Sequence, residues 1–233
     1  LCIIPARKGS KGIKNKNIKR LNQIPLVAYS ITNAKRSNLI DKVFVTTDGE
    51  KIGNISKKFG AEVIKRPKNL CNDIIMPDYA VIHAIKYIEK QLKYDFDYVV
   101  FLQPTSPLRK KGELDTAIRK CIKNNVDTLF SSTDYKPFIW RWKGNKLSPV
   151  NFKPQNRQRR QINFEVNETG SFYIVKRESF LKRKNRFGKK IINFKSEFYN
   201  SLEIDTLEEF NHINGLLKSS ILKKHDLCLP KLN

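Results

Sequence analysis

Short apolar runs alternate with helical periodicities along most of this 233-residue sequence, and that alternation limits the fold more than any other feature. The runs are rich in branched aliphatic residues and stop at turn signals, as is typical of strands buried on both faces. Strands separated by helices form parallel, doubly wound sheets. We therefore expect an α/β fold with a mostly parallel sheet, in one domain over residues 1–233. The expected strands cover residues 1–4, 42–47, 61–64, 97–102, 128–133, 170–175, 191–194 and 201–206.

Apolar residues at helical spacing fill the segments between these runs. We expect helices from residue 25 onward and over residues 50–59, 77–92, 112–124 and 177–184. A last helix is expected after Thr206, because Thr206 and Glu209 have the spacing of a capping box. Its apolar face carries Phe210 and Ile213.

The alternation lapses over residues 134–168. This segment contains both tryptophans of the chain, Trp140 and Trp142. It also contains a basic cluster formed by Arg157, Arg159 and Arg160. We interpret the segment as an insertion built on the sheet, serving as a flap or as an oligomer contact.

The chain is strongly basic, with 46 basic and 22 acidic residues and a formal net charge of +24. Two hypotheses compete: a basic nucleic-acid-binding module, or a general bias toward lysine. The lysines are scattered over most predicted elements and no RNA- or DNA-binding motif is present, which favours the bias. The charge would still attract anionic substrates at low salt.

The location of the protein is predicted from what the sequence does not contain. No apolar run is long enough to span a bilayer, and no secretory signal peptide is recognisable. The four cysteines lie far apart and form no C-x-x-C pair, which argues against a zinc site. Scattered thiols of this kind are typical of reduced proteins, so we expect a cytoplasmic location.

The loop after the first strand concentrates glycine and positive charge. Gly9 and Gly12 let backbone N–H groups approach an anion, and Arg7, Lys11 and Lys16 add cations. Open α/β sheets bind ligands at the carboxyl ends of their strands, so this loop is a candidate triphosphate cradle. It has neither the Walker A spacing nor G-x-G-x-x-G, and the alternative is a solvated basic turn.

Seven short motifs, each present once, follow one another along nearly the whole chain, at residues 3–17, 45–48, 66–67, 102–109, 160–161, 170–174 and 204–206. The most specific are I-P-A-R-K-G-S-K-G-I and L-Q-P-T-S-P-L-R. Together they resemble the acylneuraminate cytidylyltransferases, or CMP-sialic acid synthetases. The resemblance implies a Rossmann-like nucleotide-diphospho-sugar transferase fold. It also implies that CTP and a nonulosonic (sialic-type) acid give a CMP-sugar acid and pyrophosphate, with Mg²⁺ required. A homodimer that uses the segment 134–168 is expected as well.

The resemblance also assigns roles to single residues. It places the nucleotide against Ala6, Arg7, Ser10, Lys11, Lys16, Asn17 and Arg66. It gives catalytic roles to Arg7, Lys16 and Gln103, and contacts with the sugar acid to Gln103, Arg160 and Tyr173. These types suit the chemistry, since cations stabilise phosphate charge and an arginine fork binds a carboxylate. Alternatives remain: Gln103 could cap its strand, Arg66 could be a surface residue before a proline, and Tyr173 could be a core residue.

Asp205 and Glu203 are the expected metal ligands. The family usually has Asp-x-Asp at this point, whereas this chain has Glu203-Ile204-Asp205. Positions two apart in a strand share one face, so both carboxylates could reach one cation. Mg²⁺ prefers such oxygens together with those of phosphate. The alternative is an acidic cap at a helix N-terminus.

Two departures from the family pattern leave the acceptor open. Thr169-Gly170 stands where Asn-Gly is common, and residues 74–77 lack the small hydroxyl residues often seen there. The alternative acceptor is an eight-carbon acid of the ketodeoxyoctonate type. Enzymes for that acid usually have Ser-Thr-Arg where this chain has Ser10-Lys11-Gly12.

Overall fold

A seven-stranded sheet with strand order β11-β7-β10-β6-β1-β4-β5 forms the centre of the computed structural model, which describes residues 1–72, 74–134, 137–155, 165–222 and 224–231. The strands are β1 (Cys2–Pro5), β4 (Val43–Thr47), β5 (Glu62–Lys65), β6 (Tyr98–Leu102), β7 (Thr128–Asp134), β10 (Val166–Lys176) and β11 (Ile191–Lys195). All of them run parallel except β10, which is antiparallel to both of its neighbours. The predicted α/β fold with a mostly parallel sheet is confirmed.

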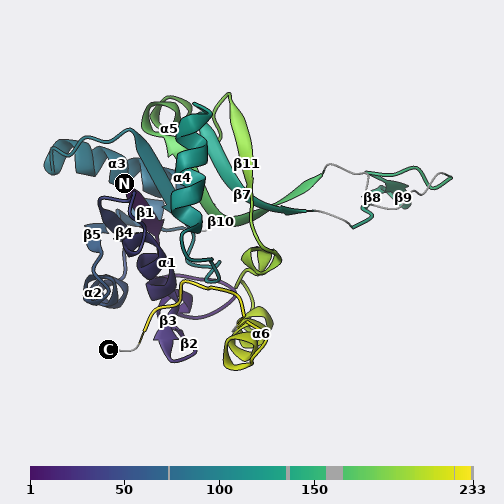
Figure 1. The fold of residues 1–233 in the computed structure, drawn as a ribbon, viewed down its shortest axis with the longest axis horizontal. Coiled ribbons are helices and arrows are strands. Elements are labelled where there is room, and N and C mark those ends of the chain that lie inside the picture. Colours follow the sequence, from purple (N-terminus) through teal and green to yellow (C-terminus); the bar gives the residue numbers. More distant parts are fainter. Residues whose placement is uncertain (73, 135–136, 156–164, 223, 232–233) are drawn as a thin grey trace.

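Helices cover both faces of this sheet (Figure 1). One face packs against α1 (Leu26–Lys35), α2 (Glu50–Lys58) and α4 (Glu113–Lys123), and the other against α3 (Pro77–Gln91) and α5 (Arg177–Arg183). Successive residues of a strand point to opposite faces, so Ile4 joins the first core cluster and Ile3 joins the second. This two-sided burial explains why the strands read as continuous apolar runs.

The chain reverses direction in the sheet between β1 and β6. From β1 it proceeds to β4 and β5, and it then returns to place β6 on the other side of β1. Ligands bind at such a switch point in open α/β sheets, outside the carboxyl ends of the strands. The basic loop after β1 and the motif after β6 therefore belong to the same edge.

A third apolar cluster lies outside the two faces of the sheet. It joins a small hairpin, β2 (Arg20–Leu21) and β3 (Ile24–Pro25), to the last helix, α6 (Leu207–Lys218). Short 3-10 turns connect the larger elements: η1 (Lys16–Ile18), η2 (Lys68–Leu70) and η4 (Phe198–Ser201). Among the described residues, no helix has both the length and the hydropathy needed to cross a membrane.

The strand predicted over residues 201–206 is wrong. In its place η4 ends at Ser201, and the residues up to Thr206 form no ladder. The N–H of Ile204 donates to the carbonyl of Thr105 at 2.9 Å. The N–H groups of Asp205 and Thr206 instead donate to the carboxylate of Glu209, each at 2.8 Å. The predicted capping box of α6 is confirmed, and it uses the donors that a strand would have needed.

Part of the segment 134–168 forms an arm that extends away from the sheet (Figure 1). The hairpin of β8 (Trp140–Lys143) and β9 (Lys146–Pro149) lies at its end, and β7 and β10 lead into it. Every residue of β8 is exposed. The basic cluster at Arg157, Arg159 and Arg160 lies outside the described residues.

The loop after β1 is seated on the segment before α6. A Cβ atom added to Gly12 would lie 1.9 Å from the carbonyl oxygen of Asp205, so only glycine fits at this contact. The ammonium of Lys16 donates to the carbonyl of Ile204 at 2.9 Å. Two segments nearly 200 residues apart in the chain are thereby held side by side.

Gly12→Ala is expected to lower the melting temperature by several degrees. Overpacking of this kind costs about 1–3 kcal/mol, and in a domain of this size each kcal/mol lowers the midpoint by roughly 2–4 °C. Differential scanning calorimetry measures the shift. Gly9→Ala in the same loop is the control, because nothing lies within 4 Å of a Cβ added there. Equal midpoints for the two variants would contradict the close contact.

Candidate active site

A cleft of about 290 Å³ opens at the switch point, at the carboxyl ends of β1 and β6. Seven of the residues predicted from the sequence line it: Arg7, Ser10, Lys16, Asn17, Arg66, Gln103 and Asp205. Ala6 is buried beneath the loop, and Lys11 is exposed to solvent outside this lining. The tertiary structure thus brings most of the predicted nucleotide residues to one place.

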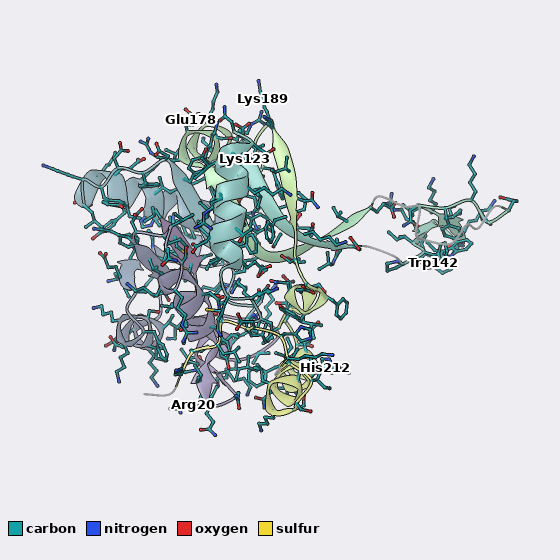
Figure 2. All side chains as sticks on the ribbon, in the orientation of Figure 1. Arg20, Lys123, Trp142, Glu178, Lys189 and His212 are labelled. Atoms are coloured by element: carbon teal, nitrogen blue, oxygen red, sulfur yellow. The ribbon has the colours of Figure 1, made fainter. Side chains whose placement is uncertain are left out.

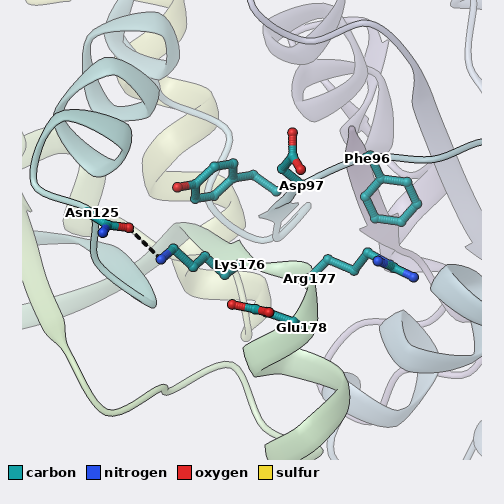
Figure 3. A pocket seen from close by; sticks show the side chains of 7 residues that line it. Phe96, Asp97, Asn125, Lys176, Arg177 and Glu178 are labelled. Atoms are coloured by element: carbon teal, nitrogen blue, oxygen red, sulfur yellow. Dashed lines mark hydrogen bonds between the residues drawn. The ribbon is translucent and has the colours of Figure 1, made fainter.

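A second hollow, of about 330 Å³, lies at the opposite end of the sheet (Figure 3). Its lining includes Phe96, Asp97 and Lys176, and the ammonium of Lys176 already donates to Asn125 at 2.6 Å. This hollow faces the amino ends of the parallel strands, where sheets of this class do not bind their ligands. The cleft at the switch point is therefore the candidate active site.

Lys16 and Asn17 hold the basic loop in place. Lys16 forms a salt bridge of 2.7 Å with Asp205, whose side chain is 64% exposed. Exposed ion pairs are weak, so this pair positions the lysine without contributing much stability. The buried amide of Asn17 donates to the carbonyl of Arg7 at 2.9 Å and fixes the start of the loop.

Arg66 presents a buried cation to the cleft. It is only 5% exposed, and its Nη2 donates to the carbonyl of Thr46 at 2.7 Å. Burial lowers the pKa of Arg66, and the nearby Arg7 cation lowers it further. Its buried Nε has no hydrogen-bond partner. Because an unused buried donor is costly, this N–H is suited to donate a hydrogen bond to an oxygen or nitrogen of a bound molecule.

Gln103 follows β6 and turns toward β10. Its Nε2 donates to the carbonyl of Gly170 at 2.9 Å, which orients the side chain at the edge of the cleft. Gly170 has a φ of +64°, and a Cβ added there would meet Glu203 at 2.1 Å. Only glycine permits both the backbone conformation and the approach of Glu203.

Glu203 and Asp205 remain neighbours although they do not lie in a strand. Burial raises the pKa of Glu203, and the carboxylate of Asp205 raises it further. The hydroxyl of Ser106 donates to Glu203 at 3.3 Å. Two mutually repelling carboxylates beside a phosphate-sized cleft fit a divalent cation that keeps several waters. The described part of the chain contains no cluster of three or more acidic, histidine or cysteine side chains placed to hold a metal ion.

Tyr173 does not line the cleft. It is 2% exposed, and its hydroxyl donates to the carboxylate of Glu168. Burial raises the pKa of Tyr173. The guanidinium of Arg186 lies 4.5 Å from the ring centres of Tyr173 and Phe101 and pairs with Asp78. Arg160, the other predicted contact with the sugar acid, lies outside the described residues.

The sequence prediction missed Arg109 as a site residue. Arg109 closes the motif after β6 and is fully buried behind Gln103. Its guanidinium donates to the carbonyl of Gln103 at 2.9 Å. The one available signal was its position in that motif, because hydropathy places an arginine at the surface.

A model of the cytidylyltransferase family matches residues 1–227. The chain belongs to this family of nucleotidyltransferases. Membership of this family does not by itself identify the molecule that accepts the cytidylyl group.

Two relatives and one solved structure illustrate the likeness. The chain is 34% identical over 186 residues to the pseudaminic acid cytidylyltransferase of Campylobacter jejuni, covering 78% of this chain and 80% of that protein. It is 29% identical over 237 residues to the N-acylneuraminate cytidylyltransferase of Escherichia coli, covering 97% of this chain but about half (54%) of that protein. A CMP:2-keto-3-deoxy-manno-octonic acid synthetase solved with CTP superimposes with a TM-score of 0.70 at 14% identity, over 93% of this chain and 97% of that chain. At this identity it shows the fold alone.

Glu203→Gln is expected to raise the melting temperature at pH 8 in the absence of divalent cations. The raised pKa means that the folded protein binds this proton more tightly than the unfolded chain, so the ionised carboxylate opposes folding at high pH. The gain should shrink as the pH falls toward the usual carboxyl value of 4.5 and vanish below it, where both states are protonated. Thermal melts between pH 8 and 4.5 measure it, with Glu208→Gln on the exposed first turn of α6 as the control. A pH-independent difference would contradict the buried charge.

Proposed function

We propose that the chain transfers the cytidylyl group of CTP to a nonulosonic acid of the sialic type, releasing pyrophosphate. The observation that carries the proposal is the cleft at the switch point, where basic residues of the first loop meet the carboxylate of Asp205, with Glu203 close behind it. This juxtaposition suits a metal-bound triphosphate, and the match to the cytidylyltransferase family supports CTP as its source.

The loop after β1 holds the triphosphate in this proposal. Arg7 and Lys16 neutralise the phosphates, and Arg7 stabilises charge on the departing pyrophosphate. Arg66, with its unused Nε, holds the nucleotide from the side of β5. The sugar's anomeric hydroxyl attacks the α-phosphorus, forming the new oxygen–phosphorus bond as the bond to pyrophosphate breaks. Catalysis then consists mainly of positioning and charge neutralisation.

Mg²⁺ is proposed as the cation held by Asp205 and Glu203. When bound, it would supply positive charge to the phosphate oxygens. Asp205 lines the cleft and is the better placed of the two carboxylates. Glu203 lies against the Gly170 turn, and burial together with the Asp205 carboxylate raises its pKa.

The acceptor is placed next to Gln103 and the Gly170 turn. Support for a sialic-type acid comes from sequence relatives named for N-acylneuraminate and for pseudaminic acid. The octonic acid synthetase is similar in fold only, so it offers weaker support for the eight-carbon alternative. A cytoplasmic location is also proposed, since all four cysteines are free thiols.

Turnover with a panel of acids tests the function. Pyrophosphate release is measured with CTP, Mg²⁺ and, in turn, sialic, pseudaminic, legionaminic and ketodeoxyoctonic acids. We expect release with at least one of the nine-carbon acids and none with UTP. Release with the eight-carbon acid alone would overturn the proposed acceptor, and no release with any acid would overturn the reaction.

The same assay of pyrophosphate release tests the proposed role of Asp205 as a metal ligand. EDTA should stop turnover, and Asp205→Ala should reduce it at least 100-fold without changing the melting temperature, because its exposed ion pair contributes little stability. Asp226→Ala removes a comparable exposed ion pair, with Lys111, and should leave turnover unchanged. Normal Mg²⁺ dependence in Asp205→Ala would contradict the assignment.

A homodimer built through the arm is proposed as well. A two-stranded hairpin is marginally stable by itself, and this one exposes aromatic surface, with Trp142 66% exposed (Figure 2). Trp140 and Phe138 pack edge-on against Phe152, which forms a small apolar cluster that a second copy could cover.

Trp142→Ser is expected to weaken this dimer at least tenfold, because it removes a large apolar contact. Sedimentation velocity over a range of micromolar concentrations measures the dissociation constant. Leu92→Ser, an exposed apolar residue after α3, is the matched control and should have no effect. A monomeric wild-type protein, or equal weakening by both variants, would contradict the proposal.

A further inference from the structure

Arg109 is a buried cation whose hydrogen bonds all go to neutral oxygens within the described part of the chain. Its relative exposure is 0%. Burying a charge without an ionised partner is costly, so such an arginine needs a compensating role. Glu113, Cys2, Cys228 and Glu203 offset part of the charge through space.

The guanidinium holds together the two strands that border the acceptor end of the cleft. Nη2 donates to the carbonyl of Gln103 at 2.9 Å, at the end of β6, and to the carbonyl of Ser171 at 2.6 Å, in β10. Nη1 donates to the hydroxyl of Ser30 in α1 at 3.1 Å, and that hydroxyl donates in turn to the carbonyl of Gln103. One side chain thus fixes three elements around Gln103.

These contacts also fix the side-chain amide of Gln103, through the turn at Gly170. Ser171 follows Gly170, whose carbonyl accepts the hydrogen bond from Gln103 Nε2. Arg109 therefore anchors both sides of the Gln103–Gly170 contact from behind. The same turn sets how closely Glu203 approaches, because a Cβ at Gly170 would touch that carboxylate.

We propose that Arg109 is a positioning residue that fixes the Gln103 amide and the Gly170 turn, and so sets the geometry of the acceptor end of the cleft. The inference rests on the proposed function, in which Gln103 faces the sugar acid. It assigns Arg109 no contact with either substrate.

Arginine suits this position better than lysine for two reasons. Its planar fork serves Ser30 and both carbonyls at once, whereas an ammonium offers no such fixed geometry. Burial lowers the pKa of Arg109 to about 10, which still leaves it charged at neutral pH. A lysine starts about two units lower, so the same burial would bring its pKa closer to neutral and leave a larger fraction uncharged.

The first readout does not depend on activity. In a ¹⁵N–¹H spectrum, the side-chain amide signal of Gln103 is identified by its loss in Gln103→Ala. We expect this signal to shift or broaden in Arg109→Lys and, to a smaller extent, in Ser30→Ala. Arg177→Lys, beside the hollow at the far end of the sheet, is the control and should leave it unmoved (Figure 3). An unmoved signal in Ser30→Ala overturns the inference even where Arg109→Lys does not fold.

Turnover supplies the second readout through a double-mutant cycle. Arg109→Lys is expected to lower kcat by about 10- to 100-fold, the loss typical of a small misplacement, while the KM for CTP changes less than twofold. In the Gln103→Ala background the same change should cost little, because the group it positions is gone. Independent, multiplying losses in the two backgrounds would show a merely structural role and overturn the inference.

The two readouts keep the inference separate from the proposed function. A wild-type protein that releases no pyrophosphate with any acid refutes the proposed function. The amide signal still decides whether Arg109 positions Gln103.

Discussion

The contact between the first loop and the segment before α6 is the constraint on which the site depends. Gly12 lies against the carbonyl of Asp205, and Lys16 donates to the carbonyl of Ile204 and to the carboxylate of Asp205. The close approach of the two backbones keeps the loop and this segment together, because the Asp205 carboxylate is too exposed for its pair with Lys16 to contribute much energy. This contact brings the basic loop next to Asp205.

The antiparallel strand β10 supplies what a fully parallel sheet would not. It pairs Phe172 with Leu102, so the Gly170 turn lies beside Gln103 at the carboxyl end of β6. A parallel strand at this position would have brought its own carboxyl end to the cleft. In β10, the residues just before its pairing with β6 lie at the cleft. The first part of the same strand, paired with β7, leads toward the arm. The strand that brings the Gly170 turn to Gln103 therefore also leads toward the arm that carries the proposed dimer contact.

Buried arginines shape the site more than the large net charge does. Arg66 borders the cleft, Arg109 lies behind Gln103, and Arg186 pairs with Asp78 over two aromatic rings. Each keeps its charge away from water through fixed hydrogen bonds to carbonyls or a carboxylate. Such cations hold defined positions and can orient neighbouring groups. The many exposed lysines can do no more than attract anions from a distance.

The sequence by itself determined the sheet class and the contents of the first loop, because hydrophobic period and turn residues are local properties. It also located half of the residues that line the cleft, through the resemblance of its motifs to a known family, and the position of the first loop at the end of a strand indicated the same edge. It failed over residues 201–206, where the Glu209 carboxylate takes the backbone donors that strand pairing would have used. It left open whether Tyr173 is a core residue or a substrate contact, and it did not indicate that Arg109 supports Gln103 from inside. Those outcomes depend on which distant groups meet and compete for the same hydrogen bonds, and only the tertiary structure decides that.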